Sequence, residues 1–224
     1  SLRDALPISR YVVTGRPLAP QQLEATPEHG RSVFDLETDV PVVLAFGGSQ
    51  GAQSINRACI DAFGGADLGF QLVHVCGPRN EDQVRRELEE RGERFEHYRL
   101  VPYTDRLAAA MAAADLVVAR SGGSVAELAA LGKPAILVPY PYATADHQRK
   151  NAREMVANGA ALLVADAELD GERLKRLVVD LLGDRARLAG MAAASAALGR
   201  PDAARRVADQ IEDILTTTRG RGAR

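Results

Sequence analysis

The sequence of 224 residues contains no tryptophan, and aromatic residues make up only 4% of it. A packed core must therefore consist mainly of alanine, leucine and valine. No apolar run is long enough to span a bilayer, and no basic segment followed by an apolar one opens the chain, so we expect neither a transmembrane span nor a cleavable signal. A formal net charge of -2 gives no general argument for a nucleic-acid partner.

Cysteine is also scarce, since Cys59 and Cys76 are the only two. Two isolated cysteines cannot form a metal cage, so we expect buried thiols in a reducing cytoplasm. The loops that follow the predicted strands lack an Asp-x-Asp pair that would hold a metal–diphosphate complex. They also offer no Ser-His-Asp arrangement. The sequence therefore predicts no metal and no other cofactor.

Hydrophobic residues make up 46% of the chain and charged residues 26%, which is typical of a globular protein. Residues 1–8 (SLRDALPI) resemble a translated sequencing-adapter end, and we expect them to be a scar outside the fold. Residues 9–40 are broken by glycines and by Pro17, Pro20 and Pro27, which predicts an irregular interdomain linker. We expect the folded domain over residues 41–217 and a disordered tail over residues 218–224.

Short apolar runs alternate with helical spacing from residue 41 onward. The runs are continuous rather than alternating, which indicates strands buried on both faces of a parallel sheet. The sequence therefore predicts an α/β fold with a doubly wound, Rossmann-like parallel sheet. Ligands of such sheets bind beyond the carboxyl ends of the strands. The expected strands are residues 41–46, 71–77, 98–103, 115–120, 134–140 and 160–165.

The loop at residues 46–54 (FGGSQGAQS) is rich in glycine. Gly47, Gly48 and Gly51 permit positive φ, and Ser49 offers a hydroxyl at a helix start, where free N–H groups favour phosphate. The loop lacks the Lys-Ser/Thr pair of a Walker A motif and the spacing of a dinucleotide fingerprint. A tight turn with Ser49 as an ordinary helix N-cap explains these residues equally well.

The segment at residues 120–134 (RSGGSVAELAALGKP) supports two interpretations. Gly122 and Gly123 free the backbone just before a helix. Ser124 and Glu127 then have the S-x-x-E spacing of a capping box, which needs no ligand. The carboxylate could instead accept the two hydroxyls of a ribose. On the residues alone, the capping box is the stronger interpretation.

Two further loops carry polar groups. In residues 139–152, Asn151 lies four positions after His147 and three after Gln148, so the polar tips should meet near a helix start and could bind sugar hydroxyls. A solvated first helical turn is the simpler interpretation. In residues 101–107, Tyr103 could flank a base. On the residues alone, a core tyrosine followed by a Thr104 cap is the stronger interpretation.

Together these loops resemble the C-terminal domain of the MurG glycosyltransferases, over about residues 12–215. Four motifs in the right order and spacing are far more specific than any one of them. Their segments are TGRP (14–17), GGSQGA (47–52), RSGG…AEL (120–128) and PAILVP…DHQ…NA (134–152). The resemblance implies the donor-binding half of a GT-B enzyme, which has two Rossmann-like domains facing a cleft.

The resemblance also implies roles at matched positions, with UDP-N-acetylglucosamine as the ligand. Ser49 would contact the diphosphate, Tyr103 and Thr104 would line the uracil pocket, and Glu127 would hold the ribose diol. This reverses the preference for a capping box and favours sugar binding at residues 147–151. The implied donor-binding residues are Gly48, Ser49, Gln50, Tyr103, Thr104, Gly122, Gly123, Ser124, Val125, Glu127, His147, Gln148 and Asn151.

The implied reaction is an inverting, metal-independent transfer of N-acetylglucosamine to a lipid-linked N-acetylmuramyl-pentapeptide in peptidoglycan synthesis. The acceptor site, the base and the membrane contact would lie in an N-terminal domain outside this chain. We therefore expect no catalytic residue here, a peripheral location at the cytoplasmic face of the bacterial membrane, and no nucleic acid. Arg16, Ala19 and His147 depart from the usual motifs. A stand-alone subunit that pairs with a membrane protein, or another UDP-sugar transferase, are the alternatives.

Overall fold

The computed structural model describes residues 11–48, 50–92 and 97–221. Contacts divide the chain into two units. The larger is Pro20–Gly199, and the smaller combines the described residues of Ser1–Ala19 and Arg200–Arg224. The predicted scar at residues 1–8 lies outside the described part of the chain.

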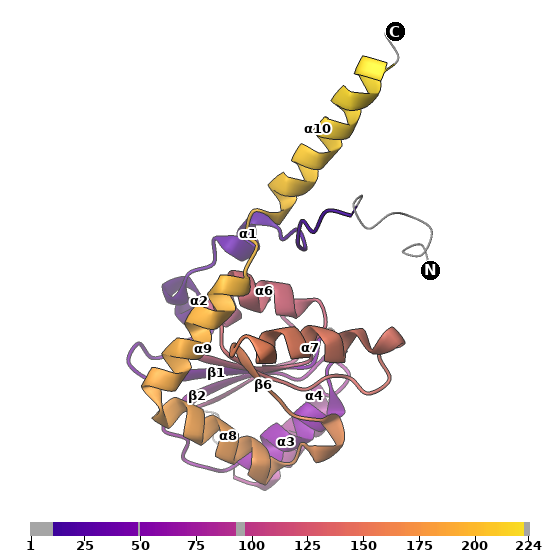
Figure 1. Ribbon diagram of the computed structural model, residues 1–224. Helices are drawn as coiled ribbons and strands as arrows, with labels where there is room; N and C mark the ends of the chain where they lie inside the picture. The colour runs from indigo at the N-terminus through magenta and orange to yellow at the C-terminus, as the bar shows by residue number, and fades with distance from the viewer. Residues whose placement is uncertain (1–10, 49, 93–96, 222–224) are drawn as a thin grey trace. The chain divides into compact units, whose positions relative to one another are not determined.

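The larger unit is built on a six-stranded sheet in the order β3-β2-β1-β4-β5-β6, with every pair parallel (Figure 1). This confirms the doubly wound, Rossmann-like prediction. β1 ends at Phe46 as predicted, and each of the other five strands ends earlier than the apolar run that predicted it, because the residues after it turn into a loop. The strands are β1 (Val42–Phe46), β2 (Gln71–Val75), β3 (Tyr98–Val101), β4 (Leu116–Ala119), β5 (Ala135–Leu137) and β6 (Ala161–Leu163).

Helices cover both faces of this sheet, which explains the continuous apolar runs. In β1, Val43 and Ala45 belong to one core cluster, while Val42, Leu44 and Phe46 belong to the other. Residues of α3, α4 and α8 pack into the first cluster, and residues of α5, α6 and α7 into the second (Figure 1). The helices are α3 (Gln53–Phe63), α4 (Glu81–Glu90), α5 (Leu107–Ala113), α6 (Ser124–Ala130), α7 (His147–Ala157), α8 (Gly171–Gly183) and α9 (Arg185–Leu198).

The predicted linker is partly helical, so that prediction is wrong for residues 20–33. Thr26 caps the second of two short helices by accepting a bond from the N–H of His29 at 3.2 Å. Pro27 starts that helix rather than breaking it, because the first helical residue has no N–H partner to lose. A Cβ on Gly30 would lie 2.1 Å from the carbonyl oxygen of Ala109, so close packing requires this glycine. The two helices are α1 (Pro20–Leu23) and α2 (Pro27–Val33).

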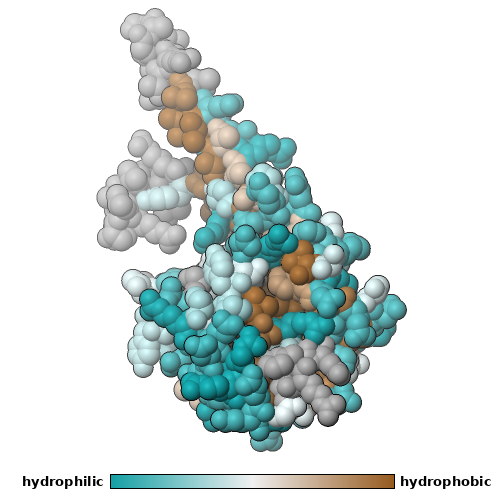
Figure 2. All heavy atoms as spheres, turned by 180° about the vertical axis from the view of Figure 1, so that it is seen from behind, coloured by the Kyte–Doolittle hydropathy of each residue, from teal (hydrophilic) through white to brown (hydrophobic). Residues whose placement is uncertain are grey.

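The smaller unit contains one long helix, α10 (Ala203–Arg221). The helix includes residues 218–221 of the segment expected to be a disordered tail, and residues 222–224 lie outside the described part. Ile211, Ile214 and Leu215 are exposed at helical spacing, and Figure 2 shows apolar surface along this helix. No helix in the described ranges is long and apolar enough to cross a membrane.

A buried polar group joins α3 to the two strands β2 and β3. The Nδ2 of Asn56 donates to the carbonyl of Cys76 at 2.9 Å, so its Oδ1 accepts from the Nε2 of His74 at 3.0 Å. The Nδ1 of His74 then accepts from the hydroxyl of Tyr98 at 2.8 Å. Burial lowers the pKa of His74 to about 3, so the imidazole is neutral at pH 7.

Both cysteines are free and buried, which confirms the prediction made for them. Burial raises the pKa of each thiol, that of Cys76 to about 11. Thiolates are therefore scarce at neutral pH, and both residues act as packing groups.

Candidate functional site

The site lies where the strand order reverses, at the carboxyl edge of β1 and β4. Phe46 at the end of β1 pairs in register with Ala119 at the end of β4. The chain leaves β1 toward β2 on one side and leaves β4 toward β5 on the other. The two glycine-rich loops that follow Phe46 and Ala119 therefore emerge beside each other at the switch point, where open α/β sheets bind ligands.

The loop after β1 brings its backbone close to its neighbours. Gly48 and Gly51 have φ of +90° and +76°, and a Cβ on Gly51 would lie 2.0 Å from the carbonyl oxygen of Cys76. Helix α3 begins at Gln53, and no side chain caps it. Its first N–H groups are thus available to an anion.

Two predicted residues of this loop have different outcomes. Ser49 lies outside the described residues, and the N-cap of α3 is Ala52. Gln50 is exposed, and its carbonyl accepts a bond from the Nδ2 of Asn80 at 3.2 Å. This bond anchors the loop to the start of α4.

A cavity of about 210 Å³ lies beside this loop and brings together Gly48, Tyr103 and Thr104. The side chain of Tyr103 is 61% exposed, so its prediction as a core tyrosine is wrong. The hydroxyl of Thr104 accepts from the N–H of Arg106 at 2.9 Å and fixes the turn into α5. An exposed ring beside an apolar hollow suits a flat aromatic ligand group. The other residues that line the cavity are Phe46, Val75, Pro102 and Leu107.

The segment after β4 does not form the capping box. Helix α6 begins at Ser124 itself, with Gly123 as N-cap and no side-chain cap bond. The hydroxyl of Ser124 donates to the carbonyl of Arg120 at 3.2 Å, and an oxygen of Glu127 accepts from the Nε2 of Gln22 at 2.9 Å. Among the described residues, no donor reaches the second carboxylate oxygen of Glu127, which is half-buried on the first turns of α6 beside Gly122, Gly123 and Val125.

The first turns of α7 pack against that segment. Asn151 donates through Nδ2 to the carbonyls of Ser121 at 3.0 Å and Gly122 at 3.4 Å. Gln148 accepts through Oε1 from the N–H of Tyr140 at 2.9 Å, and its Nε2 lies 3.8 Å from where a Cβ on Gly122 would stand. The amide of Asn151 therefore holds the loop, while the Nε2 of Gln148 faces it.

His147 does not join this arrangement. It is exposed, and its Nδ1 donates to the carbonyl of Thr144 at 2.7 Å, one turn back. Because a carbonyl can only accept, the Nδ1 carries the proton. No hydrogen bond in the described part of the chain links His147 to Gln148 or Asn151, so the expected meeting of all three polar tips is wrong for His147.

Four residues that the structure places here have no role predicted from the sequence. Gln22 of α1 supports Glu127. Arg120 is buried, and its guanidinium bonds the carboxylate of Asp166 at 2.5 Å and the hydroxyl of Ser54 at 3.0 Å. These partners are 46 to 105 positions apart in sequence, so no local spacing could have found them. The only signal was that Arg120 opens one of the quoted motifs.

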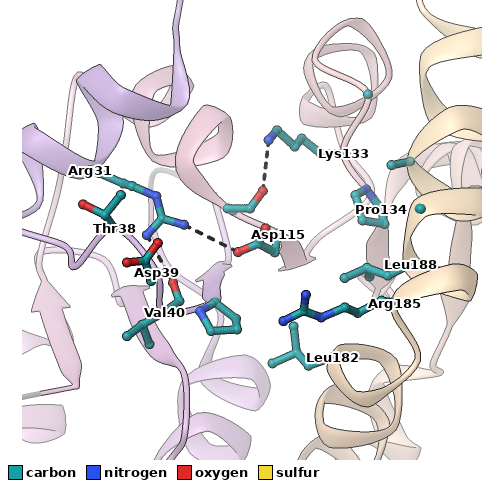
Figure 3. Close-up of a pocket in the computed structure, with 15 residues that line it drawn as sticks. Arg31, Thr38, Asp39, Val40, Asp115, Lys133, Pro134, Leu182, Arg185 and Leu188 are labelled. Carbon is teal, nitrogen blue, oxygen red and sulfur yellow. Dashed lines mark hydrogen bonds and ion pairs between the residues drawn. The ribbon is translucent and has the colours of Figure 1, made fainter.

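A larger cavity, of about 440 Å³, lies at the opposite edge of the sheet, where β1, β4 and β5 begin (Figure 3). Two of its charged groups, those of Lys133 and Asp115, bind the protein itself. The Nζ of Lys133 donates to the carbonyls of Ala112 and Ala114 at 2.7 and 3.0 Å, and the carboxylate of Asp115 accepts from the N–H of Val42 at 2.8 Å. Burial lowers the pKa of Lys133. These bonds fasten strand starts to the end of α5, so we place the site at the carboxyl edge.

The carboxyl edge offers a ligand backbone amides, side-chain amides and the carboxylate of Glu127, while the carboxylate of Asp166 is paired with Arg120. Within residues 11–48, 50–92 and 97–221, no group of three histidine, cysteine, aspartate or glutamate side chains could hold a metal ion. Two glycine-rich loops at the switch point, flanked by an exposed tyrosine and a carboxylate, are typical of Rossmann-like domains that bind nucleotides. Solved structures of GT-B glycosyltransferases share this fold.

Comparison with known proteins gives the family. Residues 42–207 match the glycosyltransferase family 28 C-terminal domain, and the chain belongs to that family. It is 39% identical over 209 residues to the UDP-N-acetylglucosamine--N-acetylmuramyl-(pentapeptide) pyrophosphoryl-undecaprenol N-acetylglucosamine transferase of Desulforamulus reducens, covering 91% of this chain and 56% of that protein. The protein of the same name from Mycobacterium avium is 46% identical over 196 residues, with 86% and 47% covered.

Solved structures agree. The MurG of Acinetobacter baumannii superposes with a TM-score of 0.71 at 25% identity, covering 93% of this chain and 58% of that one. The UDP-GlcNAc 2-epimerase of Neisseria meningitidis, at 17% identity and a TM-score of 0.68, shares the fold over 95% of this chain and 57% of its own. The chain thus spans about half the length of the relatives that it matches.

Proposed function

We propose that this chain is the donor-binding half of an enzyme that transfers N-acetylglucosamine from UDP-N-acetylglucosamine to a lipid-linked N-acetylmuramyl-pentapeptide. One observation carries the proposal: the two glycine-rich loops emerge side by side at the switch point of a family 28 domain. The names of relatives that are 37–46% identical supply the substrates. The structure supplies a site whose chemistry fits the donor.

The phosphates of the donor would lie against the loop after β1. Gly48 and Gly51 allow close backbone approach there, and the uncapped start of α3 supplies N–H donors. Ser49 lies outside the described residues, and its hydroxyl would contact the diphosphate as the resemblance implies. The uracil would enter the cavity shared by Tyr103 and Thr104, with the tyrosine ring along its side. Aromatic contact of this kind tolerates any base, so backbone groups of the loop would read the edge of the uracil.

The ribose would be held by Glu127. Gln22 occupies one carboxylate oxygen and orients the group, which leaves the other oxygen for a ribose hydroxyl. A charged acceptor makes shorter and stronger hydrogen bonds than a neutral one, so this contact should contribute strongly to affinity. Gln50 remains a candidate contact at the mouth of the loop.

The sugar would lie against the segment from Gly122 to Val125. The Nε2 of Gln148 faces that segment and could bind a sugar hydroxyl. Asn151, whose amide is bonded to two loop carbonyls, would act on the sugar through the loop rather than directly. His147 would reach the sugar only by giving up its bond to Thr144.

In the reaction, the C4 hydroxyl of the muramyl acceptor would attack the anomeric carbon of N-acetylglucosamine. The bond from that carbon to the phosphate oxygen breaks, the configuration inverts, and UDP leaves with the bonding electrons. Amide N–H groups of the glycine-rich loops and of α3 would stabilise the charge that develops on the diphosphate. The acceptor's proton would pass to a base in the other half of the enzyme.

The lipid-linked acceptor places the proposed enzyme at a membrane surface. We infer a peripheral association with the cytoplasmic face of the cell membrane, made by the half of the enzyme that binds the acceptor. Within this chain, residues 41–217 would form the donor domain and residues 9–40 would lead into it. Neither the membrane nor a nucleic acid is a proposed ligand of the donor loops.

Donor and acceptor profiling of the full gene product tests the proposal. The enzyme should transfer labelled N-acetylglucosamine from its UDP ester to a lipid-linked muramyl-pentapeptide, and should use UDP-glucose and UDP-galactose poorly. Diacylglycerol should not replace the acceptor. Efficient transfer of another sugar, or transfer to diacylglycerol, would show that this chain serves a different UDP-sugar transferase.

A further inference from the structure

Arg120 has the position of a phosphate ligand but not the orientation of one. It follows β4 directly and precedes the glycines at 122 and 123, yet only 9% of the residue is exposed. Its Nη1 donates to the carbonyls of Val138 and Pro139 at 3.2 and 3.3 Å. Its guanidinium also lies 5.5 Å from the ring centre of Tyr140. The charged group therefore points into the protein, under the loop after β5.

Two partners complete this environment. Nη1 of Arg120 bonds Oδ1 of Asp166 at 2.5 Å, and Nη2 donates to the hydroxyl of Ser54 at 3.0 Å. That hydroxyl donates in turn to Oδ1 of Asp166 at 2.6 Å. The three side chains form a closed triangle in which the positive charge is matched by one carboxylate. Charge-assisted bonds with such geometry are the strong ones.

Together with the two carbonyl bonds of Arg120, the triangle connects four separate parts of the chain. Ser54 belongs to α3, Arg120 follows β4, Val138 and Pro139 follow β5, and Asp166 starts the short 3₁₀ helix η3 (Asp166–Glu168) after β6. The first three of these parts carry or border a loop of the proposed site. A long-range bond set of this kind fixes the spacing of loops that have few contacts of their own.

The loop that follows Arg120 is held from its other side by α7. The hydroxyl of Ser121 donates to the carbonyl of Gln148 at 2.8 Å, and Asn151 binds the carbonyls of Ser121 and Gly122. The backbone between Arg120 and Gly122 is thus fastened at both ends. Its remaining freedom depends on whether the guanidinium stays in place.

We propose that Arg120, Asp166 and Ser54 are positioning residues that hold the two glycine-rich loops in the spacing required by a nucleoside diphosphate, without touching it. The inference rests on the proposed function and assigns a role within that same site. It separates Arg120 from the direct phosphate ligands. The side chain acts through the backbone of Ser121 and Gly122.

The variant Asp166→Asn tests this role, because it keeps the shape of the side chain and removes its charge. Positioning predicts that the dissociation constant of UDP rises on the order of tenfold, as for other residues that orient a ligand's direct contacts. A direct phosphate ligand predicts the reverse, since freeing Arg120 from its carboxylate would strengthen UDP binding. Arg120→Lys should weaken binding as well, because a single ammonium cannot span four acceptors.

A matched control lies on the same turn. Glu168→Gln breaks the exposed 2.7 Å pair between Glu168 and Arg173 and should leave UDP affinity unchanged. Affinity is measured by calorimetry well below the melting temperature of each variant, where a purely structural role would lower the melting temperature but not the affinity. Ser54→Ala removes only the hydroxyl and gives a milder variant should Asp166→Asn fail to fold.

The outcomes separate cleanly. Weaker UDP binding in Asp166→Asn or Ser54→Ala, with Glu168→Gln unchanged, supports the positioning role. Unchanged or tighter binding in folded Asp166→Asn and Ser54→Ala overturns it. If the unaltered chain binds neither UDP nor UDP-N-acetylglucosamine, the proposed function itself fails, which is a different result.

Discussion

Replacement of Glu127 by alanine separates the two interpretations that its sequence spacing allowed. Within the described part of the chain the carboxylate caps no helix and accepts one bond, from Gln22 at 2.9 Å. Loss of a cap would lower the free energy of unfolding by about 0.5–2 kcal/mol. Loss of the Gln22 bond should lower it by a similar amount, about 0.5–1.5 kcal/mol, which for a chain of this size moves the melting temperature by at most ~6 °C, so the affinity for UDP is the quantity that decides.

The effect on UDP binding should be larger. A hydrogen bond to a charged group contributes about 1.5–3 kcal/mol, so Glu127→Ala should raise the dissociation constant of UDP roughly 10- to 100-fold. Gln22→Ala loses the same protein bond and keeps the carboxylate, so it should cost similar stability and less affinity. Glu154→Ala, at an exposed position on α7, is the neutral control.

Calorimetry with UDP and thermal unfolding of the same samples give both quantities. The reasoning is refuted if Glu127→Ala melts at a lower temperature while its affinity for UDP is unchanged. That result would show that the carboxylate stabilises the fold and does not bind UDP.

Three other predictions concern separate features. The pKa of His74 is lowered from 6.5 to about 3, so the unfolded chain binds more protons than the folded one as the pH falls below 6.5. The free energy of unfolding should therefore fall by about 2 kcal/mol through this residue between pH 7 and pH 5. If urea unfolding shows the same fall in the wild type and in His74→Gln, this prediction is contradicted. Gly30→Ala should lower the free energy of unfolding by about 1–3 kcal/mol through overpacking against Ala109, whereas Gly190→Ala, which has open space around it on α9, should raise it by up to ~1 kcal/mol. A higher melting temperature for Gly30→Ala than for Gly190→Ala would contradict this packing. Tyr103→Ala should weaken UDP binding by about 1–3 kcal/mol with little change in melting temperature. Tyr142→Ala, at another exposed tyrosine, should leave UDP binding unchanged. Equal losses of affinity in both variants would show that the ring of Tyr103 does not contact the uracil.

Much of the fold was predictable because a strand that is buried on both faces requires apolar residues at successive positions. The runs around Val43 and Val117 contain no polar residue, which only a covered parallel strand requires. The helix at residues 27–33 was missed because Pro27 and Gly30 are strong breakers on local propensity alone. Pro27 is tolerated because it stands at the helix start, and Gly30 is required because the helix packs closely against Ala109.

The loops of the candidate site could be predicted from the sequence, but the distant residues that hold these loops in place could not. The glycines at 48 and 122, and Tyr103 and Glu127, all follow a strand, so the edge of the sheet collects them. Gln22 and Asp166 reach the site across long sequence separations, and their types fit many roles. His147 shows the converse error, because spacing on a helix placed it near Gln148 while its ring turned back to the carbonyl of Thr144.

Titration of the chain with UDP-N-acetylglucosamine in the presence of EDTA tests the central claim most directly. Binding by amides, Glu127 and an aromatic ring needs no divalent cation, so calorimetry should show a 1:1 complex whose affinity is unchanged by added Mg²⁺. UDP should compete for the same site. No heat of binding from folded protein, or binding only when Mg²⁺ is present, would contradict the account.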